Sequence, residues 1–166
     1  MTSFNESMLE YRRLLSEGRL QRAYQGLMAY FSDLRTHLRD AHPGIPVSKS
    51  IYYGYMDMTY FALVPEALKE LKLKIALVFL HEDYRFVAWL SGANRDVQAH
   101  YWHLLKESGW DAFRLSDDPR REDFVLEQVL VQEPEFGDLD SLTAQIEEGI
   151  LAFIGRVEEA LDEING

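Results

Sequence analysis

The sequence predicts an α+β fold, with a mostly antiparallel sheet of about five strands packed by long N- and C-terminal helices and a middle helix. Apolar residues recur every three or four positions through 20–39 and 139–164, which is the period of an amphipathic helix. Residues 73–80 and 84–90 are nearly all apolar and flank three polar residues, as in a buried hairpin. Short connections favour antiparallel pairing, and the length suits a single domain over 1–166.

Two helices are predicted before the first strand. Residues 5–16 show a short amphipathic pattern, and Gly18 ends it because glycine enters the left-handed region at little cost. The longer helix over 20–39 follows, and Pro43 and Pro46 then make a loop.

The stretch 50–61 is predicted to be a strand, because its five aromatic residues favour a pleated, half-buried surface. In simple alternation, one face would carry Tyr53, Tyr55 and Asp57, and the opposite face would be apolar. A helical turn is expected over 64–69, with a proline in its first turn.

The second half of the chain alternates a helix with short strands. Asn94 is expected to cap a helix that Gly109 closes. Residues 112–115 and 124–131 are predicted strands, although the pattern of the second also fits a helix. The charged segment 116–123 between them shows no core pattern and is predicted to be a loop.

The composition indicates in which cellular compartment the protein is expected. The chain has no cysteine, which excludes disulfides and thiolate chemistry. No apolar run approaches the roughly 20 residues that span a bilayer, so no membrane partner is expected. The first residues lack the basic and apolar regions of a secretory signal, and a cytoplasmic location is therefore expected.

The net charge of −11 is unevenly distributed. Residues 117–166 hold 3 Lys/Arg and 15 Asp/Glu, including Asp138 and Asp140, either of which can cap the C-terminal helix. Such a chain repels phosphate backbones, so no nucleic-acid partner is expected. The acidic helix is either a solvated face or a surface for a protein partner or a second copy in a homodimer.

Several stretches of the chain share a recognisable pattern. They are the Ser-Ile-Tyr-Tyr-Gly-Tyr-Met-Asp-Met-Thr-Tyr-Phe motif at 50–61 and residues 24–28, 33–37, 73–81, 84–94 and 97–108. Together they resemble a family of uncharacterised bacterial proteins of about the same length, with the weakest match across 115–123. That resemblance implies a bacterial single-domain protein and supplies no catalytic residues.

The order of helices and strands is also similar, more distantly, to the core of restriction-endonuclease-like nucleases. The alternative hypothesis is therefore a Mg²⁺-dependent hydrolase, or an inactive relative, using Asp57, Glu70 and Lys72. Glu-x-Lys triplets are common by chance, and the acidic surface disfavours a nucleic-acid substrate.

Other catalytic patterns are missing from the sequence. His100 and His103 lie three apart on a predicted helix without further zinc ligands, so they are interpreted as surface histidines. His81-Glu82-Asp83 is explained by a polar turn. No nucleophile elbow or glycine-rich phosphate loop is present, and neither a metal nor a cofactor is expected.

One polar and aromatic set remains as a candidate small-molecule site. Its members are Arg35, Tyr53, Tyr55, Asp57, Arg85 and Trp89. If their strands adjoin, aromatic walls would enclose one cation and one anion, as in many ligand pockets. The alternative is an Arg–Asp pair with tyrosines at the edge of the core.

Overall fold

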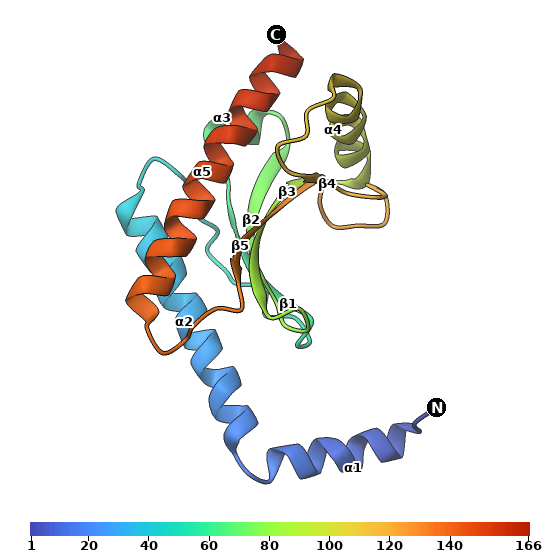
Figure 1. Ribbon diagram of the computed structural model, residues 1–166, viewed down its shortest axis with the longest axis vertical. Helices are drawn as coiled ribbons and strands as arrows, with labels where there is room; N and C mark the ends of the chain where they lie inside the picture. The colour runs from blue at the N-terminus through green and yellow to red at the C-terminus, as the bar shows by residue number, and fades with distance from the viewer.

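The computed structural model describes residues 1–166 as five helices and five strands (Figure 1). The helices are α1 (Phe4–Leu15), α2 (Arg19–Ala41), α3 (Glu66–Glu70), α4 (Arg95–Ser108) and α5 (Leu139–Asn165). The strands are β1 (Met58–Leu63), β2 (Leu73–Leu80), β3 (Arg85–Gly92), β4 (Arg114–Leu115) and β5 (Leu126–Gln132). None of the helices combines the length and the apolar character that a membrane-spanning segment requires.

The five strands form one sheet in the order β1-β2-β3-β5-β4, and every neighbouring pair is antiparallel. The predicted α+β class is confirmed, as is the hairpin of β2 and β3. Its register places Lys74 opposite Ser91 and Ala76 opposite Trp89. Directly opposed residues share a face of the sheet, so these four side chains lie on the same side.

Helices α2 and α5 pack on one face of the sheet (Figure 1) and enclose the main core. Phe86 lies at the centre of an aromatic cluster in this core. Its ring centroid is 5.8 Å from that of Phe31 on α2 and 4.9 Å from that of Phe79 on β2. The apolar periodicity of the two long helices is explained by this burial.

The opposite face carries a smaller apolar cluster to which no helix contributes. It consists of Ala76, Val78, Val87, Trp89 and Phe124. We call this side the open face of the sheet. Side chains near its rim are only partly covered, which leaves room for a cavity.

The caps of two helices agree with the sequence. Asn94 Oδ1 accepts a hydrogen bond of 2.9 Å from the Val97 backbone N–H at the start of α4. Asp138 Oδ1 accepts one of 3.1 Å from the Ser141 N–H, so Asp138, rather than Asp140, caps α5.

The predicted strand over 50–61 is wrong in its first half. β1 begins only at Met58, and Tyr52 pairs back onto Tyr60 through two backbone hydrogen bonds of 2.8 and 2.9 Å. The chain reverses because Gly54 and Met56 take left-handed conformations, with φ of 74° and 64°. A Cβ on Gly54 would lie 2.1 Å from the Met58 carbonyl oxygen, so only glycine fits this reversal.

Helices α2 and α5 are joined by a polar cluster around Glu147. Its Oε2 lies 3.1 Å from His37 Nε2 and 2.7 Å from His42 Nε2. The hydrogen bond with His42, followed by that with His37, lowers the pKa of Glu147 below its ordinary value of 4.5. The folded chain therefore favours the charged carboxylate.

We expect this cluster to make the free energy of unfolding depend on pH in the acidic range. Because the pKa of Glu147 is lower in the folded chain, its contribution is complete above pH 4.5 and is lost as pH falls through the folded value. Glu147→Gln should remove this component, which is at most about 1 kcal/mol for a partly exposed pair. Urea unfolding between pH 7 and 3 measures it, with exposed Glu148→Gln as the control. Parallel curves for wild type and Glu147→Gln would contradict the assignment.

Candidate functional site

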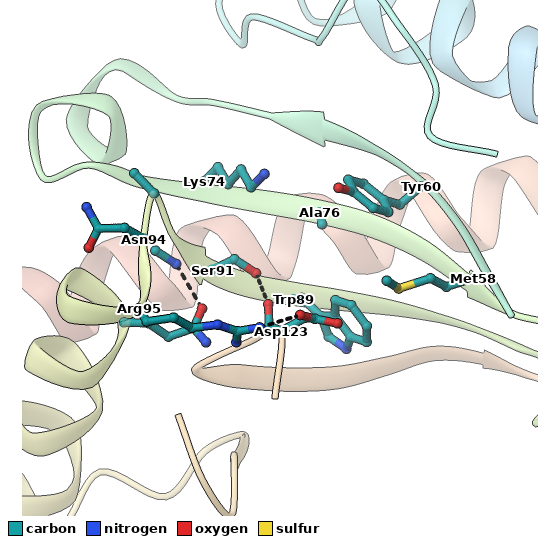
Figure 2. A pocket seen from close by; sticks show the side chains of 12 residues that line it. Met58, Tyr60, Lys74, Ala76, Trp89, Ser91, Asn94, Arg95 and Asp123 are labelled. Atoms are coloured by element: carbon teal, nitrogen blue, oxygen red, sulfur yellow. Dashed lines mark hydrogen bonds and ion pairs between the residues drawn. The ribbon is translucent and has the colours of Figure 1, made fainter. Parts of the chain in front are cut away.

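The open face contains a cavity of about 250 Å³ between β1–β3 and the start of α4 (Figure 2). The residues that line it are Met58, Tyr60, Lys74, Ala76, Trp89, Ser91, Gly92, Ala93, Asn94, Arg95, Gln98 and Asp123. Apolar and aromatic side chains line one part of it and charged or hydrogen-bonding groups the other. This mixture is typical of sites for small molecules.

Trp89 provides a rigid aromatic wall. Its indole Nε1 donates a hydrogen bond of 2.8 Å to Glu127 Oε2, and its ring stacks on Phe124 at a centroid distance of 5.2 Å. Glu127 is itself buried and accepts a second bond of 2.8 Å from Arg114 Nη1. Both partners hold the indole in one orientation, because a buried tryptophan N–H needs an acceptor.

Lys74 is the uncompensated cation of the cavity. Figure 2 shows its side chain extended along β2 toward Tyr60, and its Nζ lies 5.8 Å from the centre of that ring. No carboxylate lies within ion-pair distance of Lys74. Burial, followed by the proximity of Tyr52 and Asp123, raises the pKa of Tyr60, so its hydroxyl is a donor at neutral pH. A cation and a hydroxyl donor therefore lie side by side.

The start of α4 supplies further donors. The N–H groups of Arg95 and Asp96 lie in the first turn and have no intrahelical acceptor, whereas the third N–H, that of Val97, donates to Asn94 Oδ1. A helix N-terminus also carries partial positive charge.

The junction between β3 and α4 is close-packed, since a Cβ on Gly92 would lie 2.6 Å from the Gln98 backbone nitrogen. Glycine is therefore required where β3 meets α4.

The loop over 116–123 closes one side of the cavity. Arg95 donates to the Glu122 carbonyl oxygen, and its Nη2 lies 3.0 Å from Asp123 Oδ1. Ser91 Oγ donates to the Asp123 carbonyl oxygen at 2.6 Å. From the other side, Gln98 Nε2 reaches the Glu122 carbonyl at 2.7 Å. This network, partly drawn in Figure 2, fixes a segment whose sequence shows no core pattern.

The six residues predicted to form a pocket are separated in the structure. Trp89 lines the cavity, and Arg85 shares its face of β3, as their spacing predicts. The expected convergence of Asp57 with Arg85 does not occur. Arg85 Nη2 is 3.7 Å from Asp83, and Asp57 accepts from the Tyr55 N–H, the main cause of its lowered pKa.

The remaining three predicted residues lie away from the cavity. Arg35 Nη1 donates to the Ser48 carbonyl oxygen at 3.1 Å, from the α2 side of the sheet. Tyr53 and Tyr55 are exposed, the latter to 92%. The reversal after Tyr52 explains this, because alternation along one continuous strand does not apply there. A binding role for these residues stays a prediction.

Sequence reasoning missed Lys74, Ser91, Arg95 and Asp123. A signal existed for the first two, which are polar residues inside otherwise apolar strands and lie two positions from Ala76 and Trp89 respectively. No such signal existed for Arg95 and Asp123. Their proximity depends on how the loop folds back on α4.

The three residues named for a nuclease site, Asp57, Glu70 and Lys72, do not come together in the structure. Asp57 lies beside the end of β2, where its carbonyl oxygen accepts from the His81 N–H. Glu70 and Lys72 precede the start of the same strand, and eight strand residues span roughly 26 Å. The three side chains cannot share one ion. No group of three or more His, Cys, Asp or Glu side chains is placed to hold a metal.

Comparison with known families agrees with the sequence resemblance. The model of a family described as a domain of unknown function (DUF7000) matches residues 4–161. The chain belongs to this family. No curated protein and no solved structure matches it. The DUF7000 match includes every residue of the cavity and carries no activity, so function rests on the chemistry of the site.

Proposed function

We propose that the open-face cavity binds a small organic anion, a carboxylate or phosphate ester attached to a planar group. The observation that carries this proposal is Lys74, a cation without a carboxylate partner beside the Tyr60 ring in a cavity of about 250 Å³. A partly enclosed ammonium gains more from an anion than an exposed one does, because the local dielectric is lower.

The groups around Lys74 support the same class of ligand. The first N–H groups of α4 and the partial positive charge of the helix end favour an anion. Arg95 has a carboxylate partner in Asp123, so this pair adds little net charge to the cavity. Arg95 therefore serves to orient the ligand more than to attract it. The flat surfaces of Trp89 and Tyr60 favour a planar group. The volume restricts the ligand to a small molecule.

The test is binding of three probes: inorganic phosphate, benzoate and phenyl phosphate. We expect phenyl phosphate to bind most tightly, because it meets both the cation and the aromatic wall. At a hundred times its Kd, a ligand stabilises the folded chain by about 2.7 kcal/mol, which raises Tm by roughly 5–10 °C in a chain of this size. Thermal melting and titration calorimetry measure these effects.

Lys74→Ala should weaken phenyl phosphate binding at least tenfold, because a hydrogen bond to a charged group contributes about 1.5–3 kcal/mol. Lys69→Ala on the exposed side of α3 is the matched control and should leave affinity unchanged. Equal affinity in both variants, or no response of the wild type to any probe, contradicts the proposal.

A further inference from the structure

Helix α1 is an amphipathic helix without a partner. It has a complete capping box at Ser3 and Glu6, yet none of its residues is buried. Its apolar stripe consists of Phe4, Met8, Tyr11 and Leu15, spaced three or four apart. Isolated helices of about 12 residues are marginal in water, and most helices are stabilised by packing of their apolar face. The stripe therefore requires another surface.

The turn before α2 directs α1 away from its own chain. Gln21 Nε2 donates to the Leu15 carbonyl oxygen at 2.8 Å, and the Gly18 N–H donates to the same oxygen at 3.2 Å. Gly18 has a φ of 76°, which suits glycine. Figure 1 shows α1 projecting from the lower end of α2, away from the rest of the molecule. These contacts oppose a simple fold-back of α1 onto α2.

The same chain has an apolar groove without an occupant. It measures about 560 Å³ and lies between the first half of α2, the turn joining β2 to β3 and the start of α5. Most of its lining residues are apolar or aromatic, among them Leu20, Leu27, Tyr84, Phe136 and Leu139. Several of them are apolar and substantially exposed, including Tyr84 and Leu139. An apolar hollow of this kind is typical of a helix-binding groove.

Charges at the two surfaces are complementary. Residues 133–140, which border the groove through Phe136 and Leu139, contain four acidic residues and no basic residue. None of those four has an ion-pair partner in the chain. Residues 11–22 contain four arginines and one glutamate. The basic end of α1 is therefore suited to lie beside the acidic segment of a second molecule.

We propose that two copies of this chain form a two-fold dimer in which α1 of each copy lies in the groove of the other. The apolar stripe of α1 covers the groove, and Arg12 at its edge faces the acidic segment 133–140. A two-fold arrangement uses each surface once in each copy and closes without free ends. The open-face cavity is lined by a separate set of residues, so the dimer does not depend on its ligand.

The first test is the mass of the full chain in solution by sedimentation velocity. Over about 1–100 µM, where interfaces of ordinary size associate, we expect a monomer–dimer equilibrium that weakens at high salt. Tyr11→Glu places a charge on the apolar stripe and should raise the dimer Kd at least tenfold. Arg13→Gln changes the net charge equally on the opposite face of α1, and it should change the Kd much less.

The second test is complementation between two defective chains. Leu139→Glu damages the groove, whereas Tyr11→Glu damages the helix. Each variant alone should be largely monomeric. An equimolar mixture should dimerise more tightly than either, because one intact helix then meets one intact groove. A single cooperative thermal transition in each monomeric variant confirms that the chain is folded, even where the loss of the dimer lowers Tm.

Three outcomes would overturn the proposal. A wild-type monomer throughout the concentration series, with Tyr11→Glu lowering Tm, means that α1 covers its own groove. A monomer whose Tm is insensitive to Tyr11→Glu means that the stripe contacts neither its own groove nor a second copy. A dimer that survives both variants means that the copies associate elsewhere.

Discussion

Phe86→Ala is expected to destabilise the folded chain by about 3–5 kcal/mol, the range found when a fully buried phenylalanine is truncated. Phe86 is 0% exposed and its ring contacts those of Phe31 on α2, Phe79 on β2 and Phe136 before α5. Its removal leaves a void where the sheet meets the segments that cover it. Because small domains are stable by only about 5–15 kcal/mol, this loss is a large fraction of the total.

Urea unfolding followed by far-UV circular dichroism measures this effect. Tyr55→Ala removes an aromatic ring that is 92% exposed and should change the free energy of unfolding by less than about 0.5 kcal/mol. Phe86→Leu should cost less than Phe86→Ala, because most of the side-chain volume is retained. If Phe86→Ala unfolds at the same urea concentration as wild type, the placement of this residue in the core is wrong.

Glu127→Ala is expected to produce the second largest loss, about 2–3 kcal/mol. Glu127 is 5% exposed and accepts hydrogen bonds from Trp89 Nε1 and Arg114 Nη1, both at 2.8 Å. Truncation leaves the buried indole N–H without an acceptor. The cost stays below that of a fully buried ion pair, because the Arg114 side chain is half exposed and reaches Asp117 and Glu122 as well.

Thermal melting should show a decrease in Tm of roughly 4–12 °C for Glu127→Ala. Glu127→Gln should lose less than half of this, because the amide oxygen still accepts from Trp89 while the charge is removed. Glu148→Ala, at an exposed position on α5, is the matched control and should have little effect. Equal Tm values for Glu127→Ala and Glu148→Ala would show that Glu127 is not part of a buried network.

Local patterns identified the main elements. The apolar period of α2 and α5 and the continuous apolar runs of β2 and β3 each report burial, which acts on every residue of an element at once. Helix caps act within three residues, so spacing alone identified Asn94 and reduced the cap of α5 to Asp138 or Asp140, between which the structure decides for Asp138. The stretch before β1 was misread, because two left-handed residues outweighed its high β propensity.

The candidate site was only partly accessible from the sequence. The sequence analysis grouped Trp89 with Arg85 in a ligand site, whereas Trp89 and Lys74 line the cavity in the structure. A binding role for Trp89 stays a prediction. The register of β2 on β3 decides this, and register depends on the turn that joins the strands. The contribution of Asp123 depends on side-chain bonds from Ser91 and Arg95, which no short-range pattern encodes.

The sequence by itself determined the class of fold, the long helices, the central hairpin and the acidic C-terminal region, because periodicity and composition are properties of continuous segments. Only the tertiary structure decided which face of the sheet stays open, which side chains meet in its cavity, and that α1 lacks a partner within its own chain. Those features arise from contacts between residues far apart in the chain, and such contacts form only when the whole core is packed.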